Sequence, residues 1–188
     1  MNQMSPKDKI KIVVIGVGQL GQHHARICAE MPEVELVGIV DTEYKRAKKL
    51  ARQYKTQAFD NYEAVSGQIE AVNIAVPTPL HFQIGSYFLQ KGIHCLIEKP
   101  ITPSLDEAQE LLDIARRKNL ILQVGHIERF NPAVIEAQKY IEEPKFIEAN
   151  RLGPYSPRVA DVSVVLDLMI HDIDIILYLV KSPIVHID

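Results

Sequence analysis

A chain of 188 residues is long enough to bury one good hydrophobic core or two small ones. Hydrophobic residues make up 47% of the chain, which excludes the disordered class. The formal net charge of -3 gives no electrostatic reason to expect binding to nucleic acid or to an anionic membrane.

The cysteines and the hydropathy pattern indicate the cellular compartment. Cys28 and Cys95 have neither metal-ligand spacing nor a disulfide framework, so we expect two reduced core thiols and no metal site. The polar N-terminus lacks the apolar core of a signal peptide. The apolar run 162–180 is interrupted by charged residues and makes a poor membrane span. We therefore expect a soluble cytoplasmic protein.

The first predicted elements are a buried strand, a glycine-rich turn and a helix. The β-branched run at 12–15 leads into Gly16-x-Gly18-x-x-Gly21, and a helix follows from about Leu20 to Glu30. This is the fingerprint of a dinucleotide-binding βαβ unit, in which the glycines allow a sharp turn, close approach of a pyrophosphate and close helix packing. The helix N-terminus attracts phosphate. Expected cofactor contacts are Gly16, Gly18, Gln19, Leu20 and Gly21.

A second apolar run, 34–40, ends at Asp41, twenty residues after Gly21. An acid at this spacing accepts hydrogen bonds from the adenosine ribose hydroxyls and repels a 2′-phosphate, which favours NAD. Lys45 and Arg46, on the next predicted helix at 43–54, could instead reach a 2′-phosphate and permit NADP. A charge run on a helix is usually a solvated face, so NAD is the expected cofactor.

Two further predicted strands are followed by candidate cofactor-binding or active-site residues. A short strand near Ala58 and a helical turn at 62–66 precede the strand at 71–76, which ends in Pro77, Thr78 and His81. Ligands of open α/β sheets lie beyond the carboxyl ends of strands, so these residues are candidate cofactor contacts. The alternative for Thr78 is a simple helix N-cap.

The strand at 93–97 follows a helix that stops at Gly92, and it ends in Glu98-Lys99-Pro100. The fold does not need a charged pair at the end of a buried strand. Glu98 is therefore a candidate cofactor contact and Lys99 a candidate active-site residue; the alternative is a solvated pair.

A capping box at Ser104 and Glu107 begins a helix that runs to about Lys118, and a last strand is predicted at 120–124. The alternation of strands and helices predicts a six-stranded, doubly wound parallel sheet, a Rossmann domain, over residues 1–124. Residues 125–188 are expected to begin an α+β domain that the chain does not complete.

This second part contains a predicted helix from Asn131-Pro132 to about Glu142 and a possible strand at 146–151. A loop at 152–161 is flanked by Arg151 and contains Arg158, so it is a candidate site for an anionic ligand group. An ordinary surface loop is the alternative.

The final predicted helix, 162–180, is apolar except for one stripe. At 100° per residue, a line of residues lies within about 40° of one direction: Ser163, Asp167, His171, Asp174 and Tyr178. Ionisable groups on a buried helix need a polar partner, which is either a salt-bridge network or a substrate.

These motifs together resemble the glucose–fructose oxidoreductase/inositol dehydrogenase (Gfo/Idh/MocA) family: GVGQLGQHHA at 16–25, VPTPLH at 76–81, EKP at 98–100, RFNP at 129–132 and Asp167-x-x-x-His171-x-x-Asp174. The resemblance implies an NAD(P)-dependent oxidoreductase acting on a sugar or cyclitol, with Lys99, Asp167 and His171 lining the active site and binding substrate. Because family chains continue into a large β-sheet domain used for oligomerisation, the resemblance also implies a homo-oligomer.

Within the family, GHIERFNPA and RLGPYSPR look most like nucleotide-sugar 3-dehydrogenases, such as those acting on UDP-N-acetylglucosamine. Arg151 and Arg158 would suit its diphosphate. The competing hypotheses are a non-catalytic module that senses NAD(H) and an inactive fragment of such an enzyme.

Overall fold

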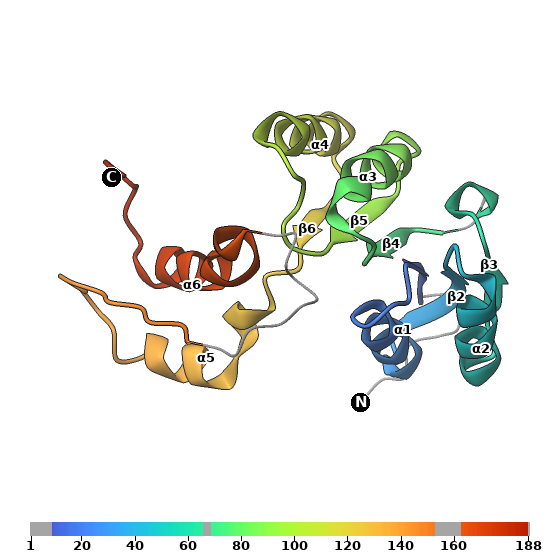
Figure 1. Ribbon diagram of the computed structural model, residues 1–188, viewed down its shortest axis with the longest axis horizontal. Coiled ribbons are helices and arrows are strands. Elements are labelled where there is room, and N and C mark those ends of the chain that lie inside the picture. The colour runs from blue at the N-terminus through green and yellow to red at the C-terminus, as the bar shows by residue number, and fades with distance from the viewer. Residues whose placement is uncertain (1–8, 66–68, 153–162, 188) are drawn as a thin grey trace. The chain divides into compact units, whose positions relative to one another are not determined.

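The computed structural model describes residues 9–65, 69–152 and 163–187, and the chain divides into two compact units, Met1–Gly125 and His126–Asp188 (Figure 1). The predicted boundary after residue 124 lies beside this division. No helix in the described residues is long and apolar enough to cross a membrane.

The first unit contains a six-stranded parallel sheet in the order β3-β2-β1-β4-β5-β6. The strands are β1 (Ile10–Ile15), β2 (Val34–Val40), β3 (Gln57–Phe59), β4 (Ala71–Ile74), β5 (His94–Ile97) and β6 (Leu122–Val124). The chain leaves β1 in one direction for β2 and β3 and then crosses to β4, so the strand order reverses between β1 and β4. This is the predicted doubly wound Rossmann sheet, and ligands bind at such a reversal.

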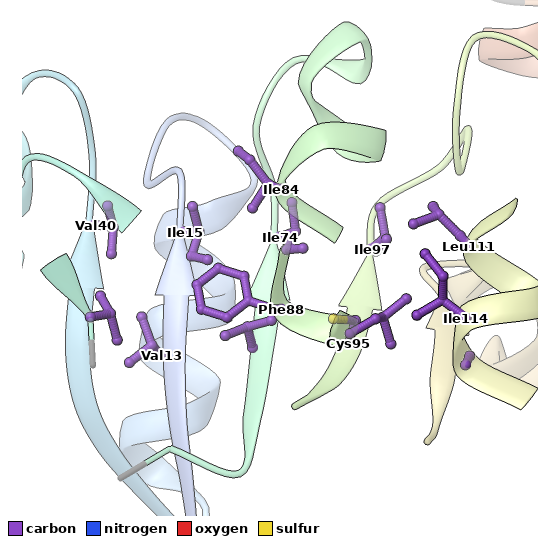
Figure 2. Packing of buried hydrophobic residues seen from close by; sticks show 14 residues of the cluster. Val13, Ile15, Val40, Ile74, Ile84, Phe88, Cys95, Ile97, Leu111 and Ile114 are labelled. Carbon is purple, nitrogen blue, oxygen red and sulfur yellow. The ribbon is translucent and has the colours of Figure 1, made fainter. Parts of the chain in front are cut away.

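Helices cover both faces of the sheet (Figure 1). On one face, α1 (Gly21–Glu30) and α2 (Tyr44–Tyr54) pack small residues such as Ala25 and Ala47 against β1 and β2. On the other face, α3 (His81–Gln90) and α4 (Leu105–Lys118) pack Phe88 and Leu111 against β4 and β5 (Figure 2). The sheet is therefore buried on both sides, which explains why its strands are near-continuous apolar runs.

The helix ends follow the predicted signals. The Ser104 hydroxyl accepts a hydrogen bond from the Glu107 N–H at 3.3 Å and caps α4, which stops at Asn119 in the left-handed conformation. Gly92, at a φ of 82°, follows α3. Cys28 and Cys95 are free and buried, as predicted.

The second unit differs from its prediction in two places. The helix α5 (Pro132–Gln138) begins where predicted, after Asn131, but ends before Glu142, and Pro144 disfavours helical backbone at the residue before it. The predicted strand at 146–151 is wrong: these residues have no regular secondary structure. A strand needs a partner strand, and the described residues of this unit contain none.

The two units also differ in burial. Every buried hydrophobic residue that the structure describes lies between Val13 and Ala115, in the first unit. In the second unit, large apolar side chains such as Phe130, Val164 and Leu177 are exposed. These side chains leave apolar surface exposed, and large exposed apolar patches mark places where another protein segment packs.

We predict that the 188-residue chain self-associates through this exposed apolar surface. Its sedimentation coefficient should rise with protein concentration, and Leu177→Glu should weaken that dependence. Leu105→Glu is the matched control, because Leu105 is 88% exposed on the first unit, whereas Leu177 is 45% exposed on the second. A chain that sediments as a monomer at every concentration would contradict this prediction.

Candidate cofactor and active site

The glycine-rich loop after β1 has the geometry that its motif predicts. Gly16 has a φ of 78°, and a Cβ there would lie 2.7 Å from the Ala75 carbonyl oxygen. A Cβ on Gly21 would lie 1.8 Å from the Gly16 carbonyl oxygen, so the start of α1 fits against the turn only with glycine at position 21. A Cβ on Gly18 would meet open space, which leaves room for a ligand beside the backbone.

The first turn of α1 is suited to an anion. It contains no acidic residue, and its N-cap, Leu20, makes no side-chain capping bond. The N-terminal N–H groups of a helix and its dipole attract phosphate.

A cavity of about 700 Å³ lies at the reversal of strand order. It is bounded by the residues that follow β1, β2 and β4, including Gly16, Gly18, Asp41, Thr42, Val76, Pro77 and Leu80. A second cavity, of about 480 Å³, shares Gly18 and Arg46 with the first and is also lined by Gln19 and Lys49. Four predicted cofactor residues, Gly16, Gly18, Asp41 and Pro77, therefore line one cavity, whose size is typical of ligand pockets.

Asp41 is 6% exposed and makes several bonds. Its carboxylate accepts hydrogen bonds from the Val17 N–H at 2.9 Å and the Glu43 N–H at 2.8 Å. Arg46 donates to the same carboxylate at 3.2 Å and also pairs with Glu43. The sequence offered Arg46 as a ligand for a 2′-phosphate and gave no sign of this pairing. The guanidinium instead binds two carboxylates.

Thr78 and His81 lie next to the large cavity but do not line it. Thr78 begins a 3-10 turn, Thr78–Leu80, and the N-cap of α3 is Leu80, so the interpretation of Thr78 as an N-cap is wrong. His81 is 1% exposed. Its Nδ1 lies 2.9 Å from the Pro100 carbonyl oxygen, and its Nε2 lies 2.9 Å from the Val76 carbonyl oxygen.

Glu98 is buried, so its interpretation as half of a solvated pair is wrong. One carboxylate oxygen lies 2.7 Å from the Nε2 of His24, and the other accepts a bond from the Lys99 N–H at 3.3 Å. Burial acts to raise the pKa of Glu98, but the His24 hydrogen bond and charge and the Lys99 N–H and ammonium outweigh it and lower the pKa below its usual value.

In the second unit, part of the polar stripe forms a network. Asp174 is 6% exposed and accepts a bond from the Nε of Arg129 at 2.7 Å, with the His126 ring 3.9 Å away. The Tyr178 hydroxyl donates to Gln138 at 2.9 Å. Arg129, known from the sequence only as part of a family motif, is thus the partner of Asp174.

Asp167 and His171 lie at the other end of the stripe. The predicted straight α-helix is wrong here, because a π-helical turn, Val165–Met169, precedes α6 (Ile170–Leu179). Asp167 is within the wide turn, and His171 is the second residue after it, in the first turn of α6. Both side chains are half-buried. Turns of this kind occur frequently at functional sites.

Arg151 has a partner that the sequence did not suggest. Its guanidinium binds the Asp172 carboxylate, with Nε to Oδ2 at 2.9 Å and Nη2 to Oδ1 at 2.7 Å. This bond lowers the pKa of Asp172 despite partial burial. Arg158 and the rest of its loop after Leu152 lie outside the described residues.

The candidate site residues fall into two groups. The glycine loop, Asp41, Glu98 and Lys99 share the carboxyl edge of the sheet in the first unit, and Asp167, His171 and Arg151 belong to the second. That Lys99 meets His171 stays a prediction.

Comparison with known proteins gave one family and several relatives. The family described as an oxidoreductase family with an NAD-binding Rossmann fold matches residues 10–126. UDP-N-acetylglucosamine 3-dehydrogenase of Acidithiobacillus ferrooxidans is 40% identical over 88% of this chain and 53% of its own length. Its crystal structure superposes with a TM-score of 0.88 at 38% identity, over 95% of this chain and 58% of that one.

A more distant relative is the NAD-dependent scyllo-inositol 2-dehydrogenase of Bacillus subtilis, 29% identical over 94% of this chain and 55% of its own length. The chain thus spans about half the length of the curated relatives that it matches.

The lowered pKa of Glu98 gives a pH prediction. A carboxylate whose pKa is lower in the folded state than in the unfolded state stabilises the fold above its unfolded pKa, and this contribution is lost as pH falls through the folded pKa. Below about pH 5, the free energy of unfolding measured in urea should fall more steeply for the wild type than for Glu98→Gln. Glu30→Gln is the control, because Glu30 is 62% exposed in a surface pair with Arg26. Parallel curves for the wild type and Glu98→Gln would contradict the prediction.

Proposed function

The chain belongs to the oxidoreductase family with an NAD-binding Rossmann fold, and from this premise we propose that it transfers a hydride between NAD and a hydroxyl-bearing carbon of a sugar. The observation that carries the proposal is the cavity at the reversal of strand order, which joins the glycine loop to Asp41 at the sheet edge that also carries Lys99.

The residues of the first unit fit the cofactor. The open space at Gly18 and the N-terminus of α1 would hold the pyrophosphate, and the buried Asp41 carboxylate would accept the ribose hydroxyls. Bound there, NAD supplies the hydride acceptor. The pairing of Arg46 with Asp41 and Glu43 supports NAD over NADP. The Arg46 guanidinium is already bound to two carboxylates and so is not available to a 2′-phosphate.

The chain's own residues would handle the proton. His171 is the proposed general base for the substrate hydroxyl, because an imidazole ordinarily exchanges protons near neutral pH. Asp167 orients that imidazole or grips a neighbouring hydroxyl. Lys99 is a cation that stabilises the alkoxide as it develops. This chemistry requires the two units to bring Lys99 and His171 to one hydroxyl.

For the substrate, we propose a nucleotide sugar oxidised at its C3 hydroxyl. The relative at 40% identity carries UDP-N-acetylglucosamine 3-dehydrogenase as its name, and a cyclitol dehydrogenase matches at 29%. Arg151 and Arg158 would bind the diphosphate. Arg151 must then exchange Asp172 for phosphate, an exchange between two anions that suits a guanidinium. We further propose that the protein acts as a homo-oligomer in the cytoplasm.

Cofactor choice is the first test of this proposal. The wild type should bind NAD more tightly than NADP in calorimetry. Asp41→Ala should reduce the preference for NAD, the ratio of the Kd for NADP to the Kd for NAD, about tenfold or more, since a hydrogen bond to a charged group contributes about 1.5–3 kcal/mol. Lys45→Ala should leave this ratio unchanged, because Lys45 is an exposed residue next to Arg46 on α2. A wild type that prefers NADP would refute the assignment.

The second test concerns the base. With NAD and UDP-N-acetylglucosamine, His171→Ala should lower turnover by roughly 10²–10⁴-fold while NAD binding is nearly unchanged. Lys99→Ala should affect the same step, so the double variant should lose less than the product of the two single losses. His23→Ala, at an exposed histidine, is the control. If the turnover loss of the double variant equals the product of the two single losses, Lys99 and His171 do not act on one hydroxyl.

A further inference from the structure

Lys99 is flanked by two residues that are each held by a histidine. We propose that His24, through the Glu98 side chain, and His81, through the Pro100 carbonyl, are positioning residues that set the place of Lys99 at the edge of the sheet. This inference rests on the proposed function for its kinetic consequence, and its geometry lies wholly within the first unit.

The first anchor lies directly before Lys99. The Glu98 carboxylate uses one oxygen for the His24 ring, at 2.7 Å, and the other for the Lys99 N–H, at 3.3 Å. Side-chain exposure is 18% for His24 and 12% for Glu98. A buried carboxylate that loses such partners incurs a large desolvation penalty, so the pair resists displacement.

The backbone at Gly125 lies beside this carboxylate. It follows β6, and its N–H donates to the Ile97 carbonyl oxygen at 2.8 Å, so its backbone is fixed beside the end of β5. A Cβ at position 125 would lie 2.9 Å from a carboxylate oxygen of Glu98 and 3.1 Å from its Cδ. The Glu98 side chain therefore occupies the space that any larger residue would need.

The second anchor lies directly after Lys99. The buried His81 ring lies between the carbonyl oxygens of Pro100 and Val76, at 2.9 Å from each. Carbonyl oxygens only accept, so each contact is a hydrogen bond when the nitrogen facing it carries a proton. His81 thus lies between the loop after β5, which carries Lys99, and the loop after β4, and can donate to either.

The two anchors connect Lys99 to the cofactor cavity. His24 is in the first turn of α1, directly after the glycine loop, and Val76 lines the cavity itself. A lysine side chain has many rotamers, and fixing its main chain on both sides limits where its ammonium can lie. Since a misplacement of about 1 Å can cost 10²-fold in rate, anchors of this kind affect turnover more than binding.

The test uses three variants and one matched control in the 188-residue chain. His24→Asn shortens the side chain that holds Glu98. Gly125→Ala leaves both partners intact and displaces the carboxylate. His81→Phe keeps a ring and removes both polar contacts. His23→Asn, the exposed neighbour of His24 on the same helix, is the control. Each test variant should lower kcat about tenfold or more, while its Kd for NAD stays within about threefold of the wild-type value. The control should leave both kcat and this Kd unchanged.

A second readout does not need turnover. With lysine labelled at Cε by ¹³C, and the Lys99 resonance assigned by its absence in Lys99→Arg, the three variants should shift that resonance, whereas His23→Asn should not. If the wild type shows no turnover, the proposed function fails. The position of the Lys99 resonance in the variants then still decides whether His24 and His81 position Lys99.

The inference is overturned if His24→Asn and Gly125→Ala both leave the Lys99 resonance at its wild-type position. It is also overturned if kcat and NAD binding fall together, as a merely structural role would require. Gly125→Ala decides the question should His24→Asn fail to fold, because Gly125 has no positive φ and the His24 and Glu98 side chains both remain.

Discussion

The contact between Gly21 and the Gly16 carbonyl is the constraint on which the candidate site depends. The missing Cβ at position 21 lets α1 start against the turn that ends β1, so the helix N-terminus faces the reversal of strand order. Asp41 is then within reach of the Val17 N–H, and His24 within reach of Glu98. A single side-chain carbon at position 21 would displace the start of α1 from the glycine loop, and with it His24 from Glu98.

The sheet could be predicted from the sequence because its signals are local. Apolar β-branched runs bounded by glycine, proline and cap residues specify strands and helices within a few residues of where they lie, and the order of those elements implies a doubly wound sheet. The glycine loop and Asp41 belong to the same class of signal, since their positions around one cavity follow from spacing within one βαβ unit.

The partners of the charged residues could not be predicted in this way. His24 and Glu98 are 74 positions apart, and Arg129 and Asp174 are 45 apart, so spacing contains no information about either pair. The π turn at Asp167 was missed because the stripe was counted at α-helical spacing. The strand at 146–151 was wrong because a strand depends on a partner that the local sequence does not reveal.

The confinement of buried apolar side chains to residues 13–115 has a consequence for biosynthesis. A chain emerging from the ribosome completes both faces of the Rossmann core once β6 has followed α4, before α6 has been translated. The first unit therefore has what it needs to fold co-translationally, whereas the second must keep its apolar helices from aggregating until a partner surface arrives. Residues 126–188 should therefore depend more on chaperones than the first unit does.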